Sequence, residues 1–323
     1  MIGRISILSL VLLAGWQVAA ANEPLQTAQR QFEVGKYEEA VTTLQAALAQ
    51  QPQDPRLYHW LSRCFLELGD YDKAIAHGER AVKLEPRNAE YHLWLGRAYG
   101  HKADQERSFW LARKVRREFE EAVRLDPANI EARSDLLEFY AEAPGIVGGG
   151  KDKARQQAEA IAALDSVEGY LARAAYWLNE KKPEQAEAEY RRVLEAKPPR
   201  AGPYLEVADF YQKQLDAARM EAAVEAAAQV NPADPRLLYY RGVLRVLAGN
   251  RLSEAEQFLK SYLATVPQRS DRPSHAAARE WLGRLYELLG KREEAAAEYR
   301  AALRLDPNRK SAREALRPTE KPR

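Results

Sequence analysis

Apolar side chains recur at helical spacing along most of the chain. Within residues 55–88, Leu61 and Phe65 share one face of a predicted helix, and Ala74 and Ala81 share a face of a second helix after a glycine turn. Each such pair of helical runs closes near a proline, which cannot continue a helix. The pattern therefore predicts a succession of helix–turn–helix units.

The prolines that close the helical pairs set the period of the chain. They lie 34, 41, 71, 34, 35 and 40 residues apart, and they are Pro52, Pro86, Pro127, Pro198, Pro232, Pro267 and Pro307. The 71-residue interval holds two units, because Ser166 stands where a proline would divide it. We therefore expect eight units, which cover residues 22–54, 55–88, 89–129, 130–166, 167–200, 201–234, 235–275 and 276–309.

The units resemble the tetratricopeptide repeat (TPR), whose pattern is W-x₂-L-G-x₂-Y…A-x₃-F…P. The last unit lacks only the first aromatic residue of this pattern and matches it at Leu282, Gly283, Tyr286, Ala295, Tyr299 and Pro307. The resemblance implies an all-α fold, a right-handed α-solenoid of about eight units. After these units we expect a capping helix over residues 310–317 and a disordered tail over residues 318–323.

Small residues explain the pattern physically. Gly96, Gly242 and Gly283 each let a first helix approach its partner closely, and an aromatic side chain such as Tyr99 fills the gap above. One helical pair cannot bury its apolar stripe alone, so stability should accumulate from neighbour to neighbour along the stack.

The first residues depart from the repeats. Arg4 precedes an apolar run over residues 5–15, and small residues follow at positions 18–21. Such a segment is typical of a secretory signal peptide, so we expect residues 1–21 to be removed and the mature chain to be periplasmic or secreted. The alternative is an uncleaved membrane anchor. Trp16 stands where a lipoprotein signal needs cysteine, and no later stretch is apolar enough to span a membrane.

Composition and charge exclude several functions. The formal net charge is only +2, so no global field attracts nucleic acid. The five histidines show no metal-binding spacing, and no catalytic serine motif is present. We therefore expect no catalysis, no cofactor and no metal, and a protein or peptide as partner. The single cysteine, Cys64, is interpreted as a small residue packed between helices.

The TPR resemblance also implies a binding surface, because in that family the first helices of successive repeats line a concave groove. Aromatic residues and arginines, which anchor many interfaces, are frequent at the corresponding positions. The predicted groove residues are His59, Trp60, Arg63, Trp94, Arg97, His101, Glu131, Asp135, Glu138, Tyr239, Tyr240, Trp281 and Arg284. The groove is expected to be basic and aromatic at one end, acidic in the middle and aromatic again at the far end. The alternative is a packing role for the tryptophans and a solvated face for the acidic residues.

Two departures from the regular repeat suggest a second surface. Residues 97–117 carry seven basic and two acidic residues, together with Phe109 and Trp110. They predict either a protruding basic elbow that contacts a partner through Trp110, or a longer second helix with a solvated basic face. Residues 144–151 are rich in glycine and formally match the phosphate-loop motif G-x-x-x-x-G-K. They follow a helical segment and continue into Asp152, however, so we do not expect an ATPase.

Two functions remain. The first is a non-catalytic scaffold or adaptor of the cell envelope that holds a polypeptide in the groove. The alternative is an accessory binding protein for an anionic ligand (a glycan, a lipid head group or a small anion) through the basic elbow 97–117 and the glycine-rich loop 144–151. Backbone N–H groups of such a loop, ahead of a helix, can hold an anion.

Overall fold

The computed structural model describes residues 23–319, and every regular element in this range is helical. The predicted signal peptide and residues 320–323 lie outside the described part. Residues 23–33 are helical. The later helices are α2 (Tyr37–Gln50), α3 (Pro55–Glu67), α4 (Tyr71–Leu84), α5 (Ala89–Glu106), α6 (Phe109–Leu125), α7 (Ile130–Glu142), the 3₁₀ turn η1 (Gly145–Val147), α8 (Lys151–Leu164), α9 (Ser166–Asn179), α10 (Pro183–Ala196), α11 (Ala201–Lys213), α12 (Ala217–Val230), α13 (Arg236–Leu247), α14 (Leu252–Thr265), α15 (His275–Leu288), α16 (Arg292–Leu305) and α17 (Lys310–Thr319). The expected all-α fold is confirmed.

The helices fall into two lobes. Residues up to Ala154 form one compact unit, the N-terminal lobe, and residues from Arg155 onwards form the C-terminal lobe. The division lies within α8.

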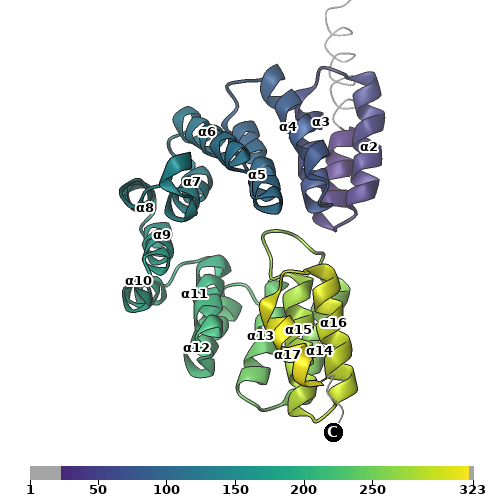
Figure 1. Cartoon of the computed structure of the whole chain (residues 1–323), viewed down its shortest axis with the longest axis vertical. Helices are drawn as coiled ribbons and strands as arrows, with labels where there is room; N and C mark the ends of the chain where they lie inside the picture. Colours follow the sequence, from purple (N-terminus) through teal and green to yellow (C-terminus); the bar gives the residue numbers. More distant parts are fainter. Residues whose placement is uncertain (1–22, 320–323) are drawn as a thin grey trace, which may run out of the picture. The chain divides into compact units, whose positions relative to one another are not determined.

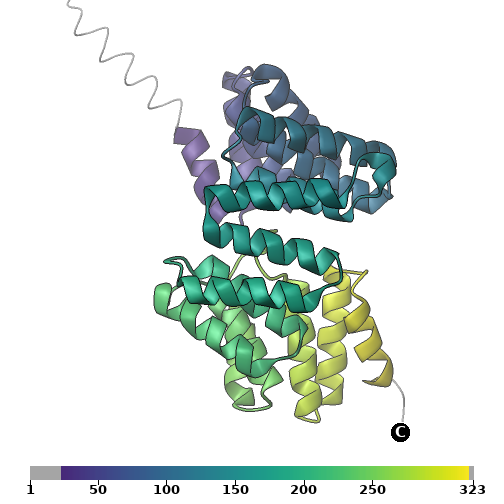
Figure 2. The ribbon, with the colours of Figure 1, turned by 90° about the vertical axis from the view of Figure 1, so that its left-hand side faces the viewer.

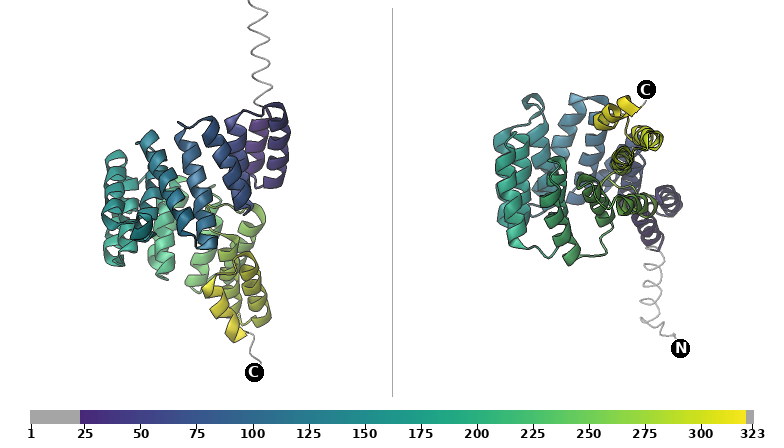
Figure 3. Two further views of the ribbon diagram at one scale, coloured as in Figure 1. Left: turned by 45° about the horizontal axis from the view of Figure 1, so that its top comes forward. Right: turned by 90° about the horizontal axis from the view of Figure 1, so that it is seen from below.

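In the N-terminal lobe, consecutive helices from α2 to α7 run antiparallel and pack side by side (Figures 1 and 3). The first helices of adjacent repeats, α3 and α5, also contact each other. Several helices begin at a short polar residue: Asp54, Asp70 and Ser108 each accept a hydrogen bond from a backbone N–H of the first turn. These caps satisfy amide groups that have no partner inside the helix, and they fix where each helix starts.

Glycine and aromatic side chains interlock between the paired helices. A methyl group placed on Gly96 of α5 would lie 2.4 Å from the Phe119 ring of α6. Likewise, a methyl group on Gly283 of α15 would lie 2.4 Å from the Tyr299 ring of α16. Because neither ring has free space around it in a close-packed core, only glycine fits at these two positions without a shift of the paired helix.

In the C-terminal lobe, the helices form the antiparallel pairs α9–α10, α11–α12, α13–α14 and α15–α16, and each pair packs on the next (Figure 2). The last helix, α17, packs on α16. Its start is held by Glu280, which is only 2% exposed and accepts hydrogen bonds from Arg309 and Ser311. This buried carboxylate therefore ties the last helix to the final repeat.

The C-terminal end differs from the expectation in one respect. We expected the capping helix to end at residue 317 and a disordered tail to begin at residue 318, whereas α17 continues to Thr319. Adding a residue to an existing helix is much easier than starting a new one, so an anchored helix extends readily by a further half turn.

The third repeat is long because both of its helices are long. α5 has 18 residues and α6 has 17, whereas α3 and α4 have 13 and 14. The turn between them is tight, with Arg107 in the left-handed region (φ 52°) and Ser108 capping α6. The structure thus combines the two interpretations: the helices are lengthened, and an exposed turn carries Phe109 and Trp110 at the start of α6.

The glycine-rich segment forms η1 between α7 and α8. Gly148 has a φ of 102°, and the Arg116 side chain packs so closely against it that a Cβ atom would meet the guanidinium group. The element that precedes this loop is the helix α7 and not a strand, so the loop lacks the setting of a phosphate loop.

Candidate partner-binding surface

The first helices of the N-terminal lobe carry alternating indole rings and arginines. The guanidinium of Arg63 lies between the rings of Trp60 and Trp94, 4.2 and 4.1 Å from their centroids. The guanidinium of Arg97 lies 4.6 Å from the Trp94 ring. All four side chains are partly exposed. Because cation–π contacts hold the rings in fixed positions, these residues form one ordered surface, named here the Arg–Trp ladder (Trp60, Arg63, Trp94 and Arg97).

Phe32 extends the ladder onto the helical residues 23–33. Its ring packs edge-on against Trp60, with centroids 5.4 Å apart, and its centroid lies 5.1 Å from the Arg63 guanidinium. Phe32 is almost fully buried and therefore supports the ladder from below. Phe32 was not among the predicted groove residues.

Arg97 connects the ladder to α7. Its Nε donates to Asp135 Oδ2 at 2.6 Å, and its Nη2 lies 2.7 Å from Glu131 Oε1. Burial raises the pKa of the Asp135 carboxyl above its ordinary value, although the Arg97 charge acts in the opposite direction. The structure thus brings the predicted basic and acidic groove residues together at this point, where they pair with each other.

Beyond this pair, the surface is acidic. Neighbouring atoms partly shield the Glu138 carboxyl from water, although the residue as a whole is exposed. This desolvation, together with the charges of Glu142 and Asp135, raises the pKa of Glu138. Asp104 of α5 adds a further negative charge nearby. Among residues 23–319, no cation lies within ion-pair distance of Glu138, Glu142 or Asp104. A basic group from outside the chain would therefore find carboxylates here that have no ion-pair partner among residues 23–319.

His101 lies on α5, one turn beyond Arg97. Its ring stacks on Tyr71 with centroids 5.5 Å apart, and its side chain is exposed. It therefore borders the ladder on an accessible part of the lobe.

Two of the predicted groove residues are buried, His59 at 6% exposure and Tyr239 at 2%. Each lies three residues before the small residue of its first helix, Ser62 or Gly242. Glu280, at the same register before Gly283, is also buried. This register points between successive first helices, so His59 and Tyr239 do not line an accessible surface as we expected.

Tyr240 and Trp281 are also buried, at 6% and 5% exposure, and they belong to the core of the C-terminal lobe. Only Arg284 of the expected far-end residues stays partly exposed. Its guanidinium lies 4.4 Å from the Trp281 ring centroid and 2.8 Å from Glu280 Oε1. The expected aromatic surface at this end is therefore absent from the accessible face of the C-terminal lobe. Trp110 lies apart from the ladder, on the second helix of its repeat.

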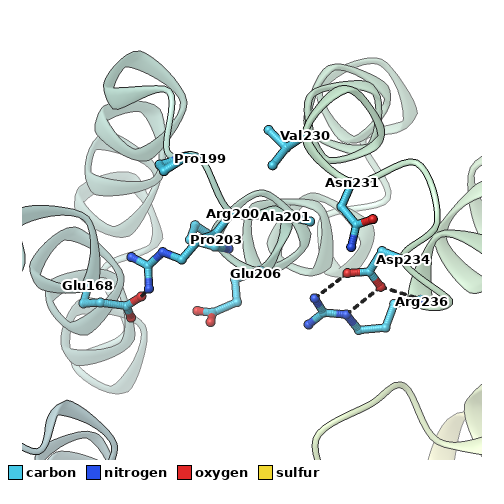
Figure 4. Close-up of a pocket in the computed structure, with 11 residues that line it drawn as sticks. Glu168, Pro199, Arg200, Ala201, Pro203, Glu206, Val230, Asn231, Asp234 and Arg236 are labelled. Carbon is cyan, nitrogen blue, oxygen red and sulfur yellow. Dashed lines mark hydrogen bonds and ion pairs between the residues drawn. The ribbon is translucent and has the colours of Figure 1, made fainter.

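The C-terminal lobe instead has a pocket of about 470 Å³ at the N-terminal parts of α9, α11 and α13 (Figure 4). Two ion pairs flank it: Arg200 with Glu168 at 3.0 Å, and Arg236 with Asp234 at 2.8 Å. Glu206 projects between them, and no described cation lies within ion-pair distance of it. Desolvation of the carboxyl by the surrounding atoms, together with the charges of Glu168 and Asp209, raises the pKa of Glu206 to about 7.

Glu206 was not predicted, although a signal was present. It lies two residues before the small residue Ala208, and Trp60 and Trp94 occupy the same register before Ser62 and Gly96. Side chains at that register are exposed or partly exposed at Trp60, Trp94 and Glu206, whereas Tyr240 and Trp281 at the same register are buried.

Three further features of the described residues concern metal binding, the single cysteine and long apolar helices. Within residues 23–319, no group of three or more His, Cys, Asp or Glu side chains is placed to hold a metal ion. Burial raises the pKa of the Cys64 thiol to about 12, which leaves it protonated and unreactive at neutral pH. No helix in the same range is both long and apolar enough to cross a membrane.

Comparison with known proteins places the repeats in a family. One tetratricopeptide-repeat family model matches residues 25–88 and 208–270, and a second matches residues 276–309. No curated protein matches the chain.

Three solved structures are similar to this chain. A thermophilic TPR protein of Thermus thermophilus is 27% identical with a TM-score of 0.46, over 54% of this chain and 90% of that one. A tetratricopeptide-repeat protein from Parabacteroides merdae ATCC 43184 is 14% identical with a TM-score of 0.45, over 94% and 100%. MamA is 17% identical with a TM-score of 0.42, over 52% and 92%. Together with the glycine-wedged helical pairs, the matched repeats show that the chain is a tetratricopeptide-repeat protein.

Proposed function

We propose that the protein is a non-catalytic scaffold of the cell envelope that holds a polypeptide segment against the Arg–Trp ladder. TPR repeats generally mediate protein–protein interactions, and proteins built from them are generally binding scaffolds. The proposal adds a location on the molecule and a chemistry to that general role.

The Arg–Trp ladder carries the proposal. Its two indole rings are partly exposed, and Arg63 holds both of them from a position midway between. Tryptophan and arginine dominate the energetics of protein interfaces. Because these side chains are already ordered by one another, a partner can bind without the cost of freezing them.

The charges around the ladder indicate what kind of segment fits. Apolar side chains of the partner would lie on Trp60 and Trp94, and a basic side chain would reach the uncompensated carboxylates of Glu138 and Glu142. Arg97 is already paired with Asp135 and separates these two sections. The proposed partner segment therefore has apolar and basic residues a few positions apart.

The envelope location rests on residues 1–21, whose charged start and short apolar run are typical of an export signal. Cell fractionation tests it, together with the mass of the purified chain. The proposal predicts a protein in the envelope or periplasmic fraction that begins near residue 22. A full-length protein in the cytoplasmic fraction would contradict it.

The binding proposal is tested by purifying partners with a tagged chain from its own cells. The double variant Trp60→Ala/Trp94→Ala should recover the specific partner at least about tenfold less well than the wild type. Trp177→Ala is the matched control, because Trp177 is also a partly buried tryptophan with a cation, Lys182, over its ring at 5.0 Å. It lies in the C-terminal lobe and should leave recovery unchanged.

Thermal unfolding of the wild type, the double variant and Trp177→Ala, followed by circular dichroism, shows whether the double variant is still folded at the temperature of the purification. Equal recovery of the partner by the folded double variant would exclude the ladder as the binding surface.

A further inference from the structure

A second exposed surface lies on the N-terminal lobe, at the start of α6. Phe109 and Trp110 are 61% and 63% exposed, and Ile146 in η1 is 72% exposed. Large apolar side chains are rarely so exposed next to one another on a protein that has no use for them. These three residues, with Arg107 and Arg113, are named the α6 tip.

The structure brings the two halves of the tip together. Arg113 Nη2 donates to the backbone oxygen of Ile146 at 3.5 Å, and α6 packs against η1. Leu111 and Val115 face the core, so the opposite face of the helix, with Arg113 between Phe109 and Trp110, points to solvent. The basic elbow and the glycine-rich loop therefore form one continuous surface.

The positive charge of the tip is not compensated within the described chain. Farther along α6, Arg116, Arg117 and Arg124 pair with the carboxylates of Glu120, Glu118 and Glu121. By contrast, Arg107 and Arg113 have no carboxylate within ion-pair distance among residues 23–319. The neighbouring acid Glu106 lies 3.6 Å from Lys102.

Lys114 adds a third cation at the edge of the tip. Its Nζ lies 4.2 Å from the centroid of the Trp110 ring, and it reaches Glu79 only at 3.5 Å. The ring of Trp110 thus has an apolar face and a cation beside it, as the aromatic residues of membrane interfaces commonly do.

We propose that the α6 tip docks the protein on an anionic lipid bilayer, with Phe109, Trp110 and Ile146 entering the head-group region and Arg107 and Arg113 binding lipid phosphates. Interfacial segments of this kind combine exposed aromatic and aliphatic side chains with cations of one sign. Hot spots of protein interfaces instead lie in well-packed pockets, whereas these three side chains are exposed at the start of α6 and in η1.

This surface is distinct from the Arg–Trp ladder. The tip lies on α6 and η1, and the ladder lies on α3 and α5. The protein could therefore bind a membrane and a polypeptide at the same time, and each proposal can fail without the other.

The test is sedimentation of the purified mature chain with vesicles of phosphatidylcholine alone or of an equal mixture with phosphatidylglycerol, at low and at high salt. The wild type should sediment with the anionic vesicles at low salt, and binding should weaken as salt screens the arginines. Arg107→Gln/Arg113→Gln should weaken binding by about fivefold for each charge removed. Phe109→Ser/Trp110→Ser should weaken it at least tenfold, because burial of two aromatic rings is lost.

Controls separate these effects from loss of folding. Leu215→Ser/Arg251→Gln removes an equally exposed apolar side chain and an exposed cation from the C-terminal lobe and should bind vesicles like the wild type. Arg107→Lys/Arg113→Lys keeps the charge and should retain most of the binding. The ladder variant Trp60→Ala/Trp94→Ala should also bind vesicles normally.

Three results would overturn the proposal: no sedimentation of the wild type with anionic vesicles at low salt, equal binding to neutral vesicles, or undiminished binding by both tip variants. Loss of a specific protein partner in the tip variants, with no vesicle binding by the wild type, would assign the tip to a protein interface instead.

Discussion

In both lobes, aromatic residues lie two positions before the small residue in the first helix of a repeat, but their exposure differs between the lobes. In the N-terminal lobe, Trp60 and Trp94 lie two residues before the small residue of their helices and stay partly exposed, with arginines between them. In the C-terminal lobe, Tyr240 and Trp281 occupy that register and are buried in the core. The neighbours of a ring, and not its register alone, decide whether it can contact a partner.

The neighbours differ in an identifiable way. Arg63 separates the two indole rings of the N-terminal lobe and keeps its charged group between them at the surface. In the C-terminal lobe, Tyr240 packs edge-on against Tyr239, with centroids 5.2 Å apart, and no arginine lies between them. Trp281 is buried even though the Arg284 guanidinium lies 4.4 Å from its ring centroid, so the feature that distinguishes the N-terminal lobe is a guanidinium between two rings.

The comparison predicts a large difference in stability between equivalent tryptophan variants. Trp281→Ala should lower the free energy of unfolding by about 3–5 kcal/mol, because it empties a core site. Trp60→Ala should cost about 1–2 kcal/mol, because its ring is already partly exposed. Urea unfolding followed by circular dichroism measures both, and equal losses would remove the distinction between the two faces.

The glycine wedge is the feature that both lobes share, and α5 contains its own control. Gly96→Ala should destabilise the protein by about 1–3 kcal/mol, because the added methyl group collides with the Phe119 ring. Gly100→Ala, on the same helix, meets no atom within 4 Å and should stabilise it by up to about 1 kcal/mol. Thermal unfolding distinguishes the two, and a neutral Gly96→Ala would show that the paired helices pack more loosely than described.

His59 should make the N-terminal lobe sensitive to acid. Burial, with a contribution from Arg63, lowers its pKa to about 3, whereas the unfolded chain takes up a proton near its ordinary value. Stability is therefore lost as pH falls through about 6.5, by about 2 kcal/mol between pH 7 and pH 5.

The variant His59→Phe keeps an aromatic ring against Tyr91 and cannot titrate. Its unfolding free energy should change less than that of the wild type over the same interval. An identical pH dependence of the two proteins would show that folding does not lower the pKa of His59.

The smallest expected effect concerns the ion pair that links the ladder to α7. A double-mutant cycle of Arg97→Ala and Asp135→Ala should give a coupling energy of about 1 kcal/mol, since both side chains are only partly shielded from water. The control pair is Lys213 and Asp209, whose lysine is 69% exposed, and it should show a coupling near zero. A coupling near zero for both pairs would mean that Arg97 does not fix α7.

The fold follows closely from the sequence because its signal is repeated. Each small residue, such as Gly96 or Gly283, has a large partner one helix away, and the spacing recurs along the chain. The starts of α3 and α6 also follow from the nearby sequence, because Asp54 and Ser108 cap these helices. The end of α17 was missed by two residues, because Ala312, Ala315 and Leu316 pack on the last repeat and the helix continues past them.

The candidate surface was only partly predictable. Trp60, Arg63 and Arg97 could be found from register and residue type. His59 and Tyr239 were misplaced by one position of the helix, which turns a side chain by about 100° and moves it from the face into the contact between helices. The contact of Arg113 with Ile146 joins residues 33 apart in sequence, and it depends on how α6 meets η1.

The most direct test of the Arg–Trp ladder as a polypeptide-binding surface is photocrosslinking in the native envelope. A photoreactive amino acid at Ser134, an exposed position beside Asp135 on α7, should crosslink to a defined polypeptide. The same group at the exposed Ala76 of α4 should not. Crosslinking to that polypeptide at Ser134 alone, and its loss in the Trp60→Ala/Trp94→Ala background, is the predicted result. No crosslinked polypeptide at Ser134, or the same one from both positions, would contradict the account.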